Sequence, residues 1–146
     1  MNFSKTTEYS LRILSFMAVN TDRLYNVDML KDEVEIPYRY LKKQMTRLVK
    51  SGLLTSIKGK HGGYKIARPL NDISLYDIVE ANGDVHMSHS CLFGFDSCVY
   101  GEKCILHDRW EHIQNQINEL LKNTTLQELK ENGPQRFIHH NLMLTK

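Results

Sequence analysis

The sequence has few of the features that mark secreted or membrane-spanning proteins. It contains three cysteines, three prolines and one tryptophan among 146 residues. An odd number of cysteines argues against the disulfide framework of a small secreted protein. No apolar run approaches the roughly 18 residues that a transmembrane helix needs, and Glu8 and Arg12 interrupt any N-terminal signal pattern. We therefore expect a cytoplasmic protein with no membrane partner.

Motifs of catalysis are missing as well. The chain has no His-Glu-x-x-His pair, no glycine loop of the phosphate-binding kind and no convincing Ser/His/Asp set. Hydrophobic residues make up 41% of the chain, which is enough for the core of one ordinary domain. These features predict a globular protein that is not an enzyme.

Acidic residues are absent from one long stretch. Between Pro37 and Arg68 there are nine Lys or Arg and no Asp or Glu, whereas the remaining residues carry 10 basic and 17 acidic side chains. A positive block in a negative background favours a polyanionic partner, and nucleic acid is the commonest one. A merely solvated surface would mix both signs more evenly.

The periodicity of the chain predicts a mainly α-helical fold with a small β-hairpin. Helical spacing is expected over 4–20, 27–34, 37–51 and 105–123, with further short helices after the capping pairs Ser74/Asp77 and Thr125/Glu128. Residues 54–58 and 64–68 are expected to form the hairpin, whose tip is rich in glycine. A basic helix followed by a basic hairpin is the layout of a winged helix-turn-helix.

This layout makes the helix from Pro37 the expected reader of the major groove, with the hairpin, or wing, along or in the minor groove. Tyr40 could instead pack inward, since the periodicity fits both orientations. The candidate DNA-contacting residues are Tyr38, Arg39, Tyr40, Lys42, Lys43, Gln44, Arg47, Lys58, Lys60 and His61.

All three cysteines fall within one short segment. Cys91, Cys98 and Cys104 are separated by six and five residues, and His107 follows the last. Three thiolates and an imidazole suit an iron–sulfur cluster or a zinc ion, although the usual zinc spacing of two to four residues is absent. Reversible oxidation of metal-free thiols is a third interpretation. An electron-transfer iron–sulfur protein would leave the basic region unexplained.

The expected long helix carries an apolar seam. Its members, spaced by four, three, four and three residues, are Leu106, Trp110, Ile113, Ile117 and Leu120. Such a seam suits packing against a partner helix. Core packing within one chain explains it equally well, because it covers only two heptads.

Several of these segments together resemble the Rrf2 family of bacterial transcription regulators, and more closely its cluster-binding branch with IscR-like and NsrR-like members. The resemblance runs from about residue 1 to about residue 130. The matching segments are "SKTTEYSLRIL", "YLKKQMTRLVKSGLLTSIKGKHGGYKIARP" and the cysteine segment that ends "CILHDRW". One departure is the first cysteine gap, which has six residues where the IscR-like pattern has five.

The resemblance implies a homodimer, joined through the helix 105–123, that binds a near-palindromic site on double-stranded DNA. It implies an iron–sulfur cluster, either [2Fe-2S] or [4Fe-4S], on Cys91, Cys98 and Cys104. The fourth ligand would be His107 or Glu8 of the partner subunit. The implied function is that of a repressor that senses nitric oxide, redox state or iron–sulfur status. A regulator of the same family with a zinc-bound or metal-free thiol-switch loop is the alternative.

The expected organisation has four parts: a winged helix-turn-helix DNA-binding domain over 1–83, a cysteine-rich cluster-binding loop over 84–104, a dimerisation helix with a following short helix over 105–132, and a tail over 133–146.

Overall fold

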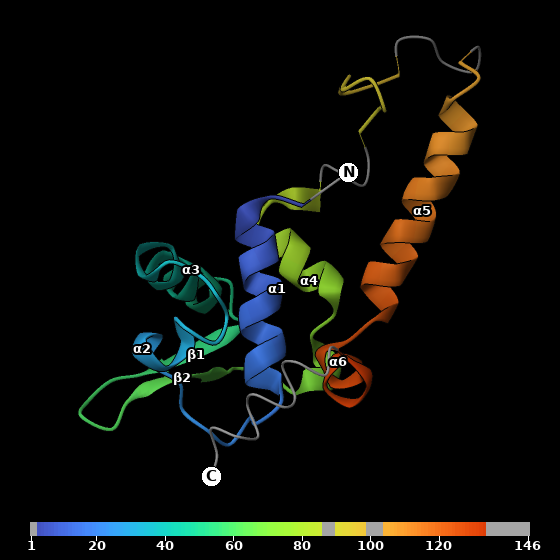
Figure 1. The fold of residues 1–146 in the computed structure, drawn as a ribbon. Helices are drawn as coiled ribbons and strands as arrows, with labels where there is room; N and C mark the ends of the chain where they lie inside the picture. Colours follow the sequence, from blue (N-terminus) through green and yellow to red (C-terminus); the bar gives the residue numbers. More distant parts are fainter. Residues whose placement is uncertain (1–2, 86–89, 99–103, 134–146) are drawn as a thin grey trace.

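The computed structural model describes residues 3–85, 90–98 and 104–133 (Figure 1). The segments 86–89 and 99–103 of the expected cysteine loop, and nearly all of the expected tail, lie outside the described residues. The elements in chain order are α1 (Lys5–Ala18), α2 (Val27–Leu30), α3 (Tyr38–Lys50), β1 (Leu54–Ile57), β2 (Gly63–Ile66), the 3-10 helix η1 (Leu70–Asp72), α4 (Leu75–Ala81), α5 (His107–Asn123) and α6 (Leu126–Asn132).

Helix α1 forms the centre of the head, which is the part of the molecule built from α1 to α4 and the hairpin (Figure 1). It begins after Ser4, whose hydroxyl accepts a hydrogen bond from the backbone N–H of Thr7 and so satisfies one of the unpaired donors of the first turn. Its apolar face is fully buried, with Ile13, Phe16 and Met17 each 0% exposed. The other head elements therefore assemble around α1.

Helices α2 and α3 form the helix-turn-helix. Asn26 caps α2, which ends at Leu30 rather than extending to residue 34 as the periodicity suggested. The chain instead turns through residues 31–35, and Glu35 takes a positive φ of 54° in that turn. Val34 is still buried, so its apolar character reflects burial in a turn rather than another turn of helix.

The wing is an antiparallel hairpin in which Leu54 pairs with Ile66 and Ile57 pairs with Gly63. Tyr25 adds a bridge to the outer side of β2, because Tyr25 and Tyr64 exchange two backbone hydrogen bonds of 2.9 and 2.7 Å. A Cβ on Gly63 would lie 2.8 Å from the carbonyl oxygen of Tyr25, which explains why this position needs glycine. The winged helix-turn-helix and the mainly α-helical class are thus confirmed.

Helix α5 extends away from the head as an arm, and the cysteine segment lies at its far end (Figure 1). The base of the arm is attached where the starts of α4 and α6 meet: Leu75 N–H donates to the carbonyl of Thr124, and Leu126 N–H donates to that of Ile73, both over 2.9 Å. Leu126 is itself fully buried in the head core. The arm is therefore tied to the head through α6 as well as through its contact with α4.

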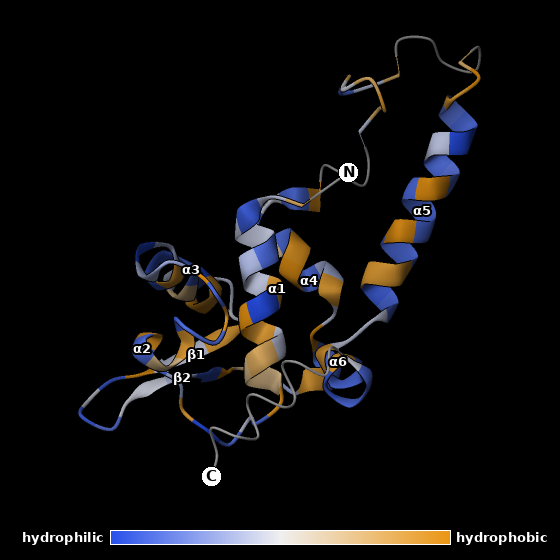
Figure 2. Cartoon of the chain, viewed as in Figure 1, coloured by the Kyte–Doolittle hydropathy of each residue, from blue (hydrophilic) through white to orange (hydrophobic). Residues whose placement is uncertain are grey.

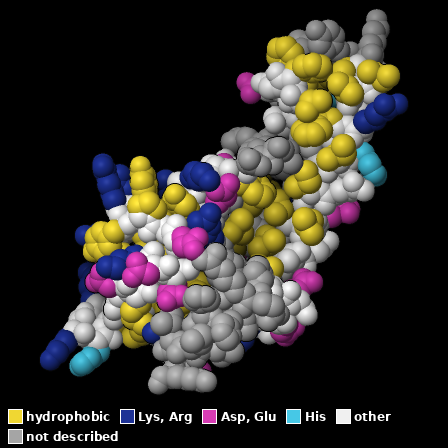
Figure 3. Space-filling model, in the orientation of Figure 1, with side chains coloured by type: hydrophobic (Ala, Val, Ile, Leu, Met, Phe, Trp, Pro, Cys, Tyr) yellow, Lys and Arg dark blue, Asp and Glu magenta, His cyan; other side chains and the backbone are white. Residues whose placement is uncertain are grey.

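The apolar seam of α5 does not face the core of its own chain. The residues that α5 buries are Gln114, Asn118 and Leu121. Ile113 and Leu120, by contrast, are 45% and 62% exposed. Figure 2 shows apolar positions recurring along the helix, and Figure 3 shows hydrophobic side chains along the surface of the arm.

None of the helices in the described part of the chain is long and apolar enough to cross a membrane.

Candidate functional site

Helix α3 separates an apolar face from a basic face. Leu41, Met45 and Leu48 are 0% exposed and pack into the head. The opposite face presents only exposed residues: Tyr38, Arg39, Tyr40, Lys42, Lys43 and Arg47. The first turn of α3 has no acidic side chain and its last turn has two basic ones, so every charged residue on the exposed surface of the helix is positive.

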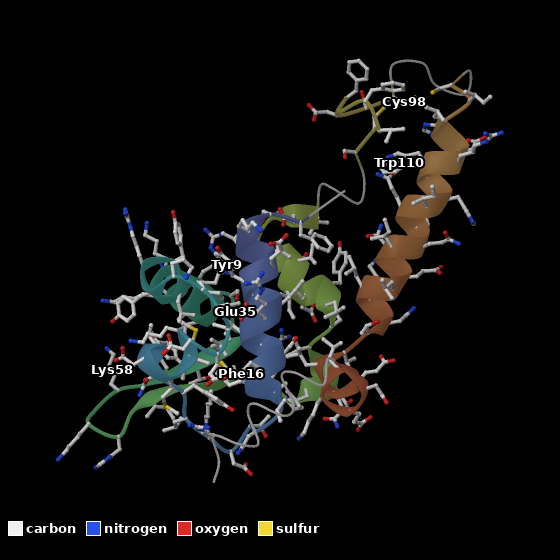
Figure 4. The ribbon with its side chains drawn as sticks, viewed as in Figure 1. Tyr9, Phe16, Glu35, Lys58, Cys98 and Trp110 are labelled. Carbon is white, nitrogen blue, oxygen red and sulfur yellow. The ribbon has the colours of Figure 1, made fainter. Side chains whose placement is uncertain are left out.

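Tyr40, whose orientation the sequence left open, points outward. Its side chain is 55% exposed, and its ring centroid lies 6.5 Å from that of Tyr9 on α1. Arg12 in turn lies over the ring of Tyr9, 5.7 Å from the centroid. The basic and aromatic surface of α3 therefore continues onto α1 (Figure 4).

Gln44 departs from the prediction that it contacts DNA. Its side chain is only 3% exposed, and its amide donates to the hydroxyl of Ser10 and, over 2.8 Å, to Oδ1 of Asn82. The position lies three residues after Leu41 and four before Leu48, which places it on the inward face of the helix. Gln44 is therefore removed from the set of residues expected to reach DNA.

The wing carries its basic residues at an exposed tip. Lys58, Lys60 and His61 are all exposed between the two strands; Lys58 is labelled in Figure 4. Gly59 takes a φ of 113° there, a conformation that residues with a side chain rarely adopt. The tip thus projects positive side chains away from the head.

The described parts of the cysteine segment contain two tight turns. The first surrounds Cys91, whose carbonyl accepts from Gly94 N–H over 2.8 Å and whose N–H donates to the carbonyl of Phe95 over 3.3 Å. Gly94 has a φ of 82°, which suits glycine. In the second turn, His107 N–H donates to the carbonyl of Cys104 over 3.1 Å as the chain enters α5.

These turns border a pocket whose lining contains all four predicted ligands, although among the described residues no three of these four have sulfur or nitrogen atoms within 4.8 Å of one another. Cys91, Cys98, Cys104 and His107 line one pocket of about 170 Å³ at the far end of the arm, with Trp110 also in its wall. The three cysteines are partly buried and none forms a disulfide. Thiolates and an imidazole are donors that iron–sulfur clusters and zinc ions both accept, so the chemistry of this lining suits such a group.

Two side chains of α5 hold the chain just before the first cysteine. The indole N–H of Trp110 and the amide of Gln114 both donate to the carbonyl oxygen of Ser90, over 2.8 and 2.7 Å. The sequence suggested Trp110 only as part of the seam and gave Gln114 no role. This contact depends on the folding back of the cysteine segment, which no local pattern predicts.

The remaining ligand candidates lie in different places. Glu8 is on the first turn of α1, does not line the pocket of its own chain and forms an ion pair of 2.7 Å with Lys5. His107 shares its helical turn with the exposed Asp108 and Glu111, and one ligand atom from each of the three lies within 4.8 Å of the others. Within one chain, His107 is therefore the candidate that accompanies the cysteines.

The end of α4 is bonded to the start of α1. Asp84 accepts from the backbone N–H of Ser4 over 3.0 Å, from its hydroxyl over 2.6 Å and from the hydroxyl of Thr7 over 2.5 Å. Burial by itself raises the pKa of the Asp84 carboxyl, but these hydrogen bonds outweigh it and hold the pKa below its ordinary value. The carboxylate is therefore charged and bonded at the point where the chain leaves the head.

Helix-turn-helix, basic wing and cysteine-bearing arm together define a winged-helix DNA-binding regulator, and sequence comparison identifies its family. Residues 3–132 match the family model Rrf2, described as an iron-dependent transcriptional regulator. This chain belongs to the Rrf2 family.

Individual relatives agree with this assignment. The chain is 36% identical over 131 residues to a protein of Aquifex aeolicus (strain VF5) described as an HTH-type transcriptional regulator, covering 88% of this chain and 91% of the relative. It is 28% identical over 138 residues to the transcriptional regulator NsrR of Oceanobacillus iheyensis, covering 90% and 91%.

Among solved structures, CymR, the global cysteine regulator of B. subtilis, matches with a TM-score of 0.77 at 22% identity, covering 90% of this chain and 97% of CymR. This likeness concerns the fold, and it supports the arrangement of head and arm described above.

Proposed function

We propose that this chain is a homodimeric transcriptional repressor that senses nitric oxide, redox state or iron–sulfur status through an iron–sulfur cluster in the cysteine pocket. The observation that carries the proposal is that Cys91, Cys98, Cys104 and His107 all line one pocket. The family description as iron-dependent and the similarity to a protein named NsrR support it. The cluster would be of the [2Fe-2S] or the [4Fe-4S] type.

The protein's own contribution at this pocket is to hold three thiolates and a weaker ligand in fixed positions. Cys91 is positioned by its turn with Gly94, and Cys104 by its hydrogen bond to His107. A bound cluster would supply a group that reacts with nitric oxide or oxygen and depends on iron supply. His107, or Glu8 of the partner subunit, would be the fourth ligand and more readily displaced than a thiolate.

DNA binding is assigned to α3 and the wing. Lys and Arg side chains on both elements would contact phosphates and supply most of the affinity. The N-terminal residues of α3, Tyr38, Arg39 and Tyr40, would reach base edges in the major groove. Lys58, Lys60 and His61 of the wing would follow the minor groove. Gln44, which lies on the buried face of α3, would not contact the DNA.

The exposed seam of α5 is assigned to the dimer interface. Ile113 and Leu120 are large apolar side chains at helical spacing that the described part of their own chain leaves 45% and 62% exposed. A matching helix of a second copy would bury them, because a seam of this kind favours helix pairing. A dimer with two-fold symmetry predicts a near-palindromic operator with half-sites one or more helical turns apart.

A regulator whose cysteines hold zinc or act as a metal-free thiol switch is the second candidate. The Cys₃His donor set is common at structural zinc sites, and the fold similarity to a cysteine regulator favours thiol chemistry. This candidate keeps the DNA-binding surface and the dimer unchanged and differs only at the pocket.

A pair of neighbouring substitutions tests the pocket assignment. Cys98→Ala should abolish the visible absorbance of protein purified without oxygen, because it removes a ligand, while the dimer survives. Ser97→Ala, at the adjoining residue of the same pocket wall, should leave the absorbance intact. A coloured and fully loaded Cys98→Ala protein would remove Cys98 from the ligand set.

A further inference from the structure

A buried polar cluster joins the recognition helix to the two helices behind it. Ser10 of α1, Gln44 of α3 and Asn82 at the C-terminal end of α4 are 0%, 3% and 9% exposed. The amide of Gln44 bonds both other side chains, and the Asn82 amide donates to the Ser10 hydroxyl over 2.9 Å. We call these three residues the polar cluster.

The hydrogen bonding of the polar cluster is complete on the donor side. The two amide hydrogens of Gln44 go to Ser10 and Asn82, and those of Asn82 go to Ser10 and to the carbonyl of Ile78 over 2.8 Å. The Ser10 hydroxyl can donate to Oδ1 of Asn82 over 3.3 Å. A buried network whose donors are all paired favours one relative arrangement of its elements, because any other leaves buried donors unpaired.

The polar cluster lies next to the point where the cysteine segment leaves the head. Asn82 is the C-cap of α4, and two residues later Asp84 is fixed to Ser4 and Thr7 of α1. The next fixed point of the described chain is Ser90, held by α5 beside Cys91. Residues 85–89 separate these two anchors in the sequence, and α4 also packs against α5. Helix α4 is therefore the head element that both contacts the arm and precedes the cysteine segment.

We propose that the polar cluster couples the cysteine pocket to DNA binding: it makes the orientation of α3 follow the end of α4, and Gln44 is its positioning residue on α3. The inference rests on the proposed function, since it needs both a changeable pocket and a DNA-reading helix. Coupling between distant sites is carried by packed side chains and hydrogen-bond networks that have discrete arrangements, and the polar cluster is such a network. Because Gln44 lies on the inward face of α3, a shift of Asn82 moves the outward face that carries Arg39 and Lys43.

The coupling is measured as a ratio of two DNA affinities, one for protein with a loaded pocket and one for protein stripped by a chelator. Allosteric couplings typically give ratios of about 5 to 150, and the wild-type ratio is expected in that range. Gln44→Met keeps the size of the side chain and removes its donors, so the ratio should fall to within about twofold of one. Gln127→Met, at an α6 glutamine that bonds only Glu131 among the described hydrogen bonds, should keep the wild-type ratio.

Each outcome separates the coupling from the proposed function. A wild-type ratio far from one that persists in Gln44→Met overturns the coupling and leaves the sensing regulator intact. A wild-type ratio of one overturns both the sensing and the coupling.

A second variant is available if Gln44→Met fails to fold. Ser10→Ala removes the acceptor that Gln44 and Asn82 share and carries the same expectation, with Ser51→Ala at the C-terminal end of α3 as its control. A loss of ratio without loss of cluster loading is a result that a merely structural role would not produce.

Discussion

The indole N–H of Trp110 donates a 2.8 Å hydrogen bond to the carbonyl oxygen of Ser90, the residue immediately before Cys91. This contact ties the first cysteine to the helix that begins with His107. Figure 4 shows Trp110 on the arm below Cys98. The pocket is thus held from one side by the turn of its own segment and from the other by α5.

The second donor to the same carbonyl gives the first prediction. Gln114→Met removes the amide that donates to Ser90 over 2.7 Å and leaves the bond from Trp110. A hydrogen bond of this kind contributes about 1 kcal/mol, so retention of the bound group should weaken about fivefold. The measurement is the chelator concentration that removes half of the visible absorbance. Gln116→Met, at an exposed position on the same helix, should behave as wild type; equal retention in both variants would mean that the Ser90 anchor has no influence on the pocket.

DNA binding through the exposed face of α3 gives the second prediction. Lys42→Ala with Lys43→Ala should weaken binding and lower the slope of log affinity against log salt by about 0.9 for each phosphate that the protein no longer neutralises. Titrations of one duplex at several salt concentrations measure both quantities. Lys130→Ala on α6 is the control, since it lies outside the proposed surface. Unchanged affinity and slope in the double variant would contradict the docking of α3.

The seam of α5 gives the third prediction. Leu120 is 62% exposed in the single chain, and Leu120→Lys should shift the protein from dimer to monomer because it places a charge in an apolar helix pair. Sedimentation analysis over a range of concentrations measures the change. Asn123→Lys introduces the same charge at an exposed position of α5 outside the seam and should stay dimeric. A monomeric wild-type protein, or a dimeric Leu120→Lys protein, would remove the seam from the interface.

The bonds of Asp84 give a pH prediction. A carboxyl with a lowered pKa in the folded state adds stability above its unfolded pKa, near 3.8, and loses that stability as the pH falls through the lower folded value. Asp84→Asn should therefore lower the free energy of unfolding at neutral pH and flatten its fall in acid. Denaturant titrations from neutral pH to about pH 3 test this, with Asp72→Asn as the control. If the free energy of unfolding of Asp84→Asn still fell steeply in acid, other groups would be responsible for the acid sensitivity.

The sequence predicted those elements whose signals are local. Ser74 and Thr125 cap their helices as their spacing implies, and Ser74 and Asp77 form both halves of a capping box. The apolar stripe of α3 and the glycine-rich tip of the wing likewise follow from short-range patterns. Local rules suffice for these features because the residues that interact are close together in the sequence.

Contacts between distant segments were outside the reach of such rules. Gln44 looked like a surface residue of a basic helix, yet its partners are 34 and 38 positions away in the sequence. Its spacing from Leu41 and Leu48 indicated that the side chain faces inward. Its polar character suggested exposure instead. The anchoring of Ser90 likewise joins residues 20 and 24 positions apart in the sequence.

The most direct measurement of the central claim uses protein purified without oxygen: its visible absorbance, together with iron, sulfide and zinc counted per chain. The account predicts brown protein that contains iron and sulfide and loses both in Cys98→Ala. Colourless protein that carries about one zinc per chain, or no metal at all, would contradict the cluster and make the cysteine pocket a structural site or a thiol switch.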